Sequence, residues 1–219
     1  GYQLLSANQP DLAEFWASNG RERTNYFFDV VSIKLLANIW RGQWDDGQWL
    51  SARSLVEERR EFQNTQDKQR IAYFNFQSGY FKHAKAYLLE LYPELADISL
   101  TINAENFRYG VYYSEILKRQ NDYKSAMKMT LRLQEFLKQL AGEPNRDVYF
   151  GIADVEFYAL NGHQDKAIES LQQAIDQQWL PNAQWLWPNL DANIFLQSLR
   201  DHKTFQALSA GLNQRLDKL

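Results

Sequence analysis

The stretch Asn161-Gly162-His163-Gln164-Asp165-Lys166-Ala167 has two relatives in the same chain, Ser78-Gly79-Tyr80-Phe81-Lys82-His83-Ala84 and Gln120-Asn121-Asp122-Tyr123-Lys124-Ser125-Ala126. The turn positions Gly79, Asn121 and Gly162 are 42 and 41 residues apart, and an Ala follows each of them in step. Gly and Asn are the residues that best tolerate the left-handed backbone of a tight turn after a helix. A small Ala lets the two helices of a hairpin cross closely. The three stretches therefore predict three helical hairpins.

The composition favours long helices. Apolar residues make up 45% of the 219 residues and aromatic residues 15%, which is enough for a sizeable core. The chain has only 10 Gly and 5 Pro, whereas an all-β fold of this length needs many more turn residues. We therefore expect an all-α fold.

The repeats divide the chain into three parts of one continuous domain. Residues 1–65 are expected to form N-terminal helices, over 10–19, 25–41 and 46–63, with a degenerate repeat near Gly42-Gln43-Trp44. Pro10 and Asp11 suit a first helical turn, and Asn19-Gly20 suits a helix end. Residues 66–180 hold the three hairpins, and residues 181–219 are expected to form helices that cap the stack.

The hairpin pattern resembles the tetratricopeptide repeat, whose second half reads Gly-Asp-Tyr-x-x-Ala. The third copy fits best, with Tyr158, Gly162, Ala167, Leu171 and Ala174 on motif positions. The period of 41–42 exceeds the usual 34, and Asn75 stands where the third copy has Tyr158. The resemblance implies an α-α superhelix of stacked antiparallel hairpins (TPR-like), right-handed, with a helical C-terminal cap.

The tail carries a second resemblance. The run Leu199-Arg200, then Phe205 and Leu208, is similar to the closing segment of bacterial winged-helix transcriptional regulators and of some adenylate cyclases and kinases. The resemblance implies the sensory or effector part of a larger bacterial regulatory or signalling protein. The chain begins at Gly1 without an initiator Met, which fits a piece of a longer protein.

Charge and cysteine content restrict the function classes. The net charge is −3, with acids and bases interspersed, so we expect no direct nucleic-acid binding by this chain. The absence of Cys excludes disulfides and thiol nucleophiles, and fits the cytoplasm and the periplasm equally. No apolar run approaches the ~20 residues of a membrane span, so no membrane insertion is expected. The sequence leaves open whether the chain forms a homo-oligomer.

The residues that could carry catalysis form no recognisable set. His83, His163 and His202 lack a second ligand at metal-binding spacing, so surface positions are expected for them. Asp45 and Asp46 precede an apolar helix and are better explained by N-terminal capping. The sequence has no Gly-x-Ser-x-Gly elbow, phosphate loop or Gly-x-Gly-x-x-Gly turn. We predict that the chain is not an enzyme and holds no metal or cofactor.

Six tryptophans form two clusters that have two interpretations. They pack in the core, or they present an exposed hot spot to a partner. The clusters are Trp40, Trp44 and Trp49, and Trp179, Trp185 and Trp187.

In the resembling family the first helix of each hairpin lines a concave groove. Motif positions place nine candidate partner-binding side chains there, with aromatic groups and charges of both signs: Gln69, Tyr73, Gln77, Arg108, Glu115, Arg119, Tyr149, Ile152 and Glu156. Such a surface suits a protein or peptide segment better than a phosphate backbone. The leading hypothesis is therefore a protein–protein or peptide interaction module. The alternatives are a small-molecule sensor with a pocket between stack and cap, dimerisation through an exposed apolar face, and, last, an enzyme.

Overall fold

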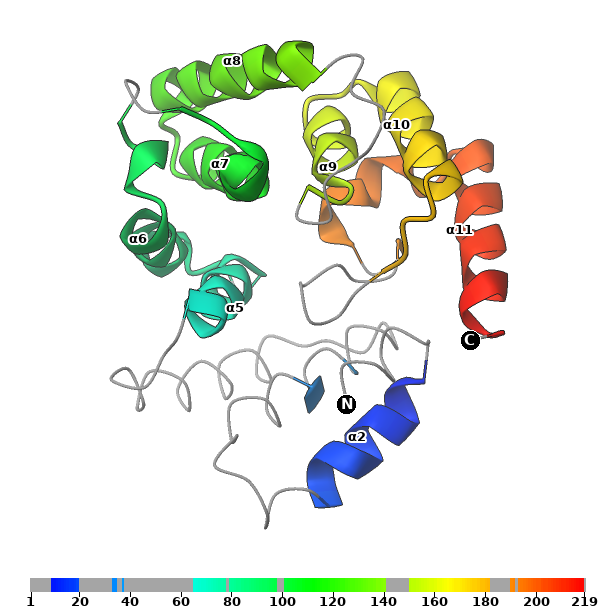
Figure 1. The fold of residues 1–219 in the computed structure, drawn as a ribbon. Helices are drawn as coiled ribbons and strands as arrows, with labels where there is room; N and C mark the ends of the chain where they lie inside the picture. Colours follow the sequence, from blue (N-terminus) through cyan, green and yellow to red (C-terminus); the bar gives the residue numbers. More distant parts are fainter. Residues whose placement is uncertain are drawn as a thin grey trace.

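A computed structural model describes residues 9–19, 33–34, 37, 65–77, 79–97, 101–140, 150–181, 190–191 and 193–218. All regular structure within these ranges is helical, which confirms the all-α prediction (Figure 1). The elements are α2 (Pro10–Asn19), α5 (Thr65–Gln77), α6 (Phe81–Leu91), η3 (Pro93–Leu95), α7 (Ala104–Arg119), α8 (Tyr123–Leu140), α9 (Ala153–Leu160), α10 (Gln164–Asp176), η5 (Ile194–Leu199) and α11 (Lys203–Leu216).

The first helix has the predicted boundaries. Helix α2 begins at Pro10, carries Asp11 in its first turn and ends at Asn19. Of the helices expected over 25–41 and 46–63, the structure describes only the helical residues 33, 34 and 37. The degenerate repeat near Gly42 lies outside the described residues.

The three hairpin turns form as predicted. Gly79, Asn121 and Gly162 have φ angles of 77°, 62° and 76°, which is the left-handed region that favours Gly and Asn. In each turn a backbone N–H beyond the turn residue reaches back to a carbonyl of the preceding helix and satisfies it. These bonds run from Tyr80 to Asn75 (2.8 Å), from Asp122 to Leu117 (2.9 Å) and from His163 to Tyr158 (2.9 Å).

Small residues of the hairpins are buried between the helices. Ala84, Ala126 and Ala167 are all buried. At Gly110 of α7, a methyl group added to the Cα would meet the Leu133 side chain of α8 at 2.9 Å. The small residues thus let α7 and α8 pack along their length.

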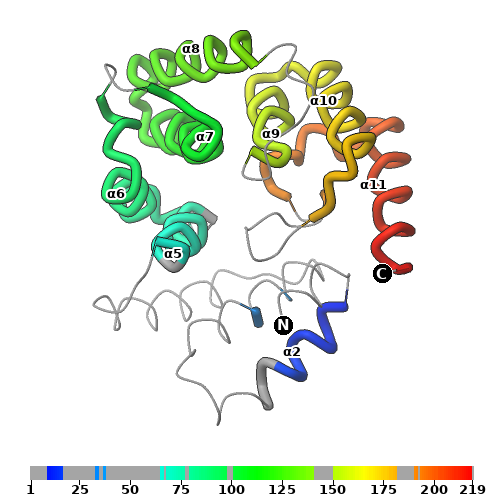
Figure 2. The backbone as a smooth tube through the Cα atoms, in the orientation of Figure 1, coloured from blue at the N-terminus to red at the C-terminus, as the bar shows by residue number. Residues whose placement is uncertain are grey.

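The hairpins follow one another along an arc (Figures 1 and 2). Helices α5, α7 and α9 lie on the inner side of the arc, and α6, α8 and α10 lie on its outer side. Contacts between α6 and α7 and between α7 and α9 join neighbouring hairpins. The inner helices therefore form the centre of the described structure.

Helix α7 is buried almost all round. Every residue from Asn106 to Leu117 is buried except the half-buried Tyr109. Its first turn is closed by a capping box, in which the side chains of Asn103 and Asn106 bond each other's backbone N–H. The polar residues Asn106, Arg108, Ser114 and Glu115 of α7 are therefore buried and do not line an open groove.

The tail packs against the last hairpin, η5 on α9 and α11 on α10. Leu199 and Phe205, two residues of the motif in the tail, are buried at this junction. The Asn193 side chain accepts the N–H of Phe195 at 3.0 Å and starts η5. The tail thus covers the end of the array and reaches its inner side through η5.

Candidate functional site

The structure corrects the expectation of an open groove. Five of the nine candidate groove residues are buried, with exposed fractions between 0 and 8%: Tyr73, Arg108, Glu115, Ile152 and Glu156. These side chains belong to the interior, so the expectation that they line an accessible surface is wrong.

The other four candidates have different positions. Gln69 is half-buried, and its amide donates to the Tyr92 hydroxyl at 2.6 Å. Arg119 is exposed and donates to Glu115 at 2.8 Å. The Gln77 side chain and Tyr149 lie outside the described part of the chain.

Phe195 of η5 occupies the inner side of the arc. Its ring stacks on Tyr112 of α7, with centroids 4.7 Å apart, and lies 5.2 Å from Phe76 of α5. Tyr73 lies 6.0 Å from Tyr112 in the same cluster. Aromatic side chains bury more area than other residues and dominate core energetics. The chain's own tail therefore packs on inner residues of the first two hairpins, which motif positions in the hairpins do not reveal.

A buried ion pair lies beside this aromatic cluster. Arg108 Nε of α7 and Glu156 Oε2 of α9 are 3.5 Å apart, and their side chains are 4% and 0% exposed. Asn193 donates to the other Glu156 oxygen at 2.8 Å, and the Arg108 guanidinium lies 5.2 Å from the centre of the Tyr112 ring. Buried charges need such partners, because removing them from water is costly. The pair connects α7, α9 and the start of η5.

Burial dominates the titration of these groups. It raises the pKa of the Glu156 carboxyl, although Arg108 and Asn193 both lower that pKa. Burial also raises the pKa of the Tyr112 hydroxyl well above its usual value. Burial lowers the pKa of Arg108, but its neighbours, with Tyr112 and Glu156 foremost, together raise that pKa, so the guanidinium stays charged. Enclosed on all sides, the cluster orients η5 and presents no group to solvent.

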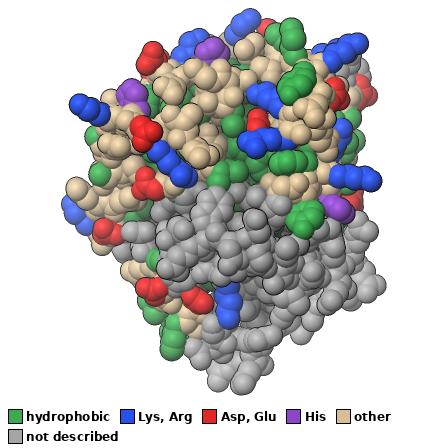
Figure 3. Space-filling model, turned by 180° about the vertical axis from the view of Figure 1, so that it is seen from behind, with side chains coloured by type: hydrophobic (Ala, Val, Ile, Leu, Met, Phe, Trp, Pro, Cys, Tyr) green, Lys and Arg blue, Asp and Glu red, His purple; other side chains and the backbone are tan. Residues whose placement is uncertain are grey.

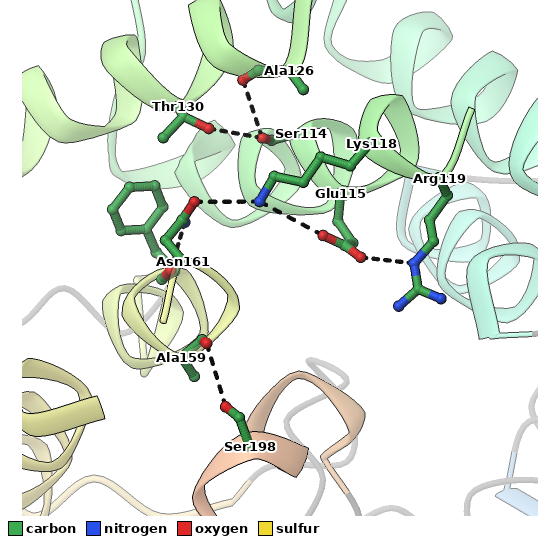
Figure 4. A network of polar contacts seen from close by, with 10 residues as sticks. Ser114, Glu115, Lys118, Arg119, Ala126, Thr130, Ala159, Asn161 and Ser198 are labelled. Carbon is green, nitrogen blue, oxygen red and sulfur yellow. Dashed lines mark hydrogen bonds and ion pairs between the residues drawn. The ribbon is translucent and has the colours of Figure 1, made fainter. Parts of the chain in front are cut away.

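A second polar network lies near the turns (Figure 4). Glu115 forms ion pairs with Arg119 at 2.8 Å and with Lys118 at 3.8 Å. Lys118 also donates to the Asn161 side chain of the next hairpin at 3.3 Å, and Ser198 of η5 donates to the Ala159 carbonyl at 3.3 Å. The predicted partner-binding residues Glu115 and Arg119 thus pair within α7, and Lys118 joins their network to the next hairpin.

Exposed large apolar side chains are confined to two helices of the described structure. On α2 they are Leu12, Phe15 and Trp16; on α8 they are Tyr123, Met127 and Leu131, which are 64%, 66% and 54% exposed. The three on α8 are spaced four residues apart, so they form one row along the helix. We call Tyr123, Met127 and Leu131 the α8 row.

Helix α8 has a separate apolar row that packs against α7. It consists of the buried residues Ala126, Met129 and Leu133. At 3.6 residues per turn, the α8 row lies roughly a third of a turn away from it. A surface helix needs one apolar stripe and normally carries polar residues elsewhere. The exposed α8 row was not predicted from the sequence, although the four-residue spacing of Tyr123, Met127 and Leu131 is visible there.

Basic side chains accompany the α8 row. Lys124 and Lys128 are exposed on the side of the row that faces away from the buried stripe. Glu135 pairs with Lys138 at 3.7 Å, and both are mostly exposed. Elsewhere the charges are mixed: on the face shown in Figure 3, acidic and basic side chains of the described residues are interspersed.

The histidines form no cluster in the structure. His83 contacts the Tyr80 ring edge-on at 6.2 Å, His163 is exposed beside Tyr158, and half-buried His202 precedes α11. Within the described ranges no three His, Asp or Glu side chains gather in a group that could hold a metal ion.

The described tryptophan of the C-terminal cluster, Trp179, is half-buried against the core. The other five clustered tryptophans lie outside the described residues, so their two interpretations stay open.

Comparison with protein-family models, with curated proteins and with solved structures gives no match to this chain. None of the described helices has the length and apolar character needed to cross a membrane. The function is therefore inferred from the chain's own geometry.

Proposed function

We propose that this chain is a protein-interaction module, a tetratricopeptide-like stack of hairpins with η5 and α11 as its cap, and that its partner binds along the α8 row. The tail resemblance supports a place in a larger bacterial regulatory protein, where such a module acts as the sensory or effector part. The proposal keeps the function expected from the hairpin pattern and moves the binding surface from the inner to the outer side of the arc.

The observation that carries the proposal is the exposure of Tyr123, Met127 and Leu131 on one helix. The fold buries α8 through Ala126, Met129 and Leu133, so it has no need of a second apolar row. Aromatic residues and Met are enriched at protein interfaces. Contiguous apolar surface that the fold leaves in water is typical of a binding site.

The inner side of the arc is a weaker candidate. A peptide there would have to displace Phe195 from its contacts with Tyr112 and Phe76. A small molecule between stack and cap, the sensor alternative, would meet the same packed rings. The α8 row requires no rearrangement, and pre-formed surfaces bind at lower entropic cost.

Met127→Lys tests the proposal, because it places a charge in the middle of the row at an exposed position. The wild type, Met127→Lys and the control Trp16→Lys on α2 are immobilised and incubated with bacterial lysate after circular dichroism shows equal helix content. We expect a captured protein that Met127→Lys loses and Trp16→Lys retains. If all three retain the same proteins equally, the α8 row is not the binding surface.

A further inference from the structure

We infer that the partner of the α8 row is an amphipathic helix whose apolar stripe is flanked by acidic side chains. This inference rests on the proposed function and specifies the partner's chemistry. It is carried by the shape of the row and by the charges beside it.

The shape of the row fits a helix. Tyr123 and Leu131 are eight residues apart, so the row rises about 12 Å along α8 and is inclined to the helix axis, because each four-residue step exceeds a full turn by about 40°. A ridge of residues four apart packs into the groove between side-chain rows of a second helix, which then crosses α8 at an angle. A partner helix would offer anchors spaced three, four and seven residues apart, which is the usual pattern of helical recognition.

The charges favour an acidic partner. The whole chain has a net charge of −3, but α8 carries four basic side chains and one acidic. Lys124 and Lys128 lie one turn apart beside Met127. Neither forms an ion pair with another described residue, whereas Glu135 is paired with Lys138. Acidic residues along one flank of the partner's stripe would meet both lysines.

The same charges disfavour a second copy of this chain. Two α8 helices packed antiparallel about a two-fold axis at Met127 would bring the same flank of both helices together. Lys124 of one copy would then face Lys128 of the other. Like charges across an interface oppose association, so the occupant we infer is a different, acidic helix.

The inference is tested with two synthetic peptides of about 18 residues that share one Leu stripe and helix content. One has Glu at every flanking position and the other has Lys. Their binding to the full chain is measured by fluorescence anisotropy at low and physiological salt. We expect the Glu peptide to bind about tenfold more tightly than the Lys peptide, with the difference shrinking as salt rises.

Charge reversal on α8 supplies the matched variant. Lys124→Glu with Lys128→Glu is expected to reverse the preference toward the Lys peptide. The control, Lys203→Glu with Lys218→Glu, changes two exposed lysines, one at the start of α11 and one shortly after its end. It should leave the preference unchanged. Met127→Lys should abolish binding of the Glu peptide.

The outcomes separate this inference from the proposed function. The inference of an acidic helix is overturned if both peptides bind equally, or if charge reversal at Lys124 and Lys128 leaves the preference unchanged. Even then, capture of a protein from lysate that depends on Met127 would still support the proposed function. If the chain dimerises as its concentration rises, and Met127→Lys prevents this, the acidic helix is overturned and the partner is a second copy of the chain. Loss of both peptide binding and Met127-dependent capture overturns the two proposals together.

Discussion

The ring of Phe195 lies 5.2 Å from the ring of Phe76, although Phe76 belongs to the first described hairpin and Phe195 to the tail beyond the third. Tyr112 of the middle hairpin stacks on both rings, at 6.0 Å and 4.7 Å. One aromatic cluster thus connects the beginning, middle and end of the described array. Among the side chains expected in a groove, Tyr73 belongs to this cluster through its contact with Tyr112 at 6.0 Å.

Phe195→Ala tests the contribution of this contact to stability. Removing a buried Phe ring leaves a cavity and is expected to lower the free energy of unfolding by about 3 kcal/mol. Urea denaturation followed by circular dichroism measures the change. The control Phe15→Ala, on a 57% exposed residue of α2, should change it by about 0.5 kcal/mol or less. Equal losses for the two variants would contradict a core role of Phe195.

Glu156 is expected to give stability a pH dependence of defined sign. Its folded-state pKa is raised by burial, so the stability that it contributes is fully present below its unfolded value near 4.5 and is lost as pH rises through the folded pKa. Glu156→Gln removes this titration. The free energy of unfolding of the wild type minus that of the variant should therefore fall with rising pH across this interval.

Urea denaturation between pH 4 and pH 8 measures this difference, and Asn193→Ala sharpens the test. The Asn193 hydrogen bond lowers the pKa of Glu156, so its removal should raise that pKa. The difference in unfolding free energy should then continue to fall up to a higher pH. A difference that rises with pH would show that Arg108 outweighs burial.

Replacement of Gly by Ala is expected to lower the stability of the protein at position 162 and to raise it at position 211. Gly162 has a φ of 76°, so Gly162→Ala forces Ala into the left-handed region and should destabilise by about 1 kcal/mol. Gly211 lies within α11 with open space where the new methyl group would lie, so Gly211→Ala should stabilise by about 0.5–1 kcal/mol. Thermal denaturation of the two variants measures both changes in stability. A gain in stability for Gly162→Ala would contradict the turn geometry.

Gly110→Ala is expected to destabilise although Ala is the better helix former. The new methyl group would meet the Leu133 side chain at 2.9 Å, and overpacking of this kind costs about 1–3 kcal/mol. The double variant with Leu133→Ala should lose less than the sum of the two single losses, because the smaller side chain removes the clash. Additive losses in urea denaturation would show that α7 and α8 do not approach closely here.

The three turns illustrate what could be predicted locally. A left-handed turn depends on the turn residue itself, so Gly79, Asn121 and Gly162 could be placed from their identity and spacing. The buried alanines five residues later followed from the same repeat. The start of α2 at Pro10 likewise depended on residues next to it in the chain.

The candidate site could not be predicted in the same way. The periodicity of α8 contains two apolar rows, and nothing in the periodicity shows that Met129 faces α7 while Met127 faces water. Arg108 and Glu156 have the residue types of a peptide-binding groove, yet they form a buried pair to which Asn193, at the start of η5, adds a hydrogen bond.

The sequence by itself thus determined the all-α class, the hairpin turns and the small residues at helix crossings, since each depends on residues close together in the chain. Only the tertiary structure decided that the candidate groove residues Arg108 and Glu156 are buried and that the α8 row is exposed. Burial of a side chain depends on what packs against it, and Phe195, which packs on Phe76 and Tyr112, lies far along the chain from both.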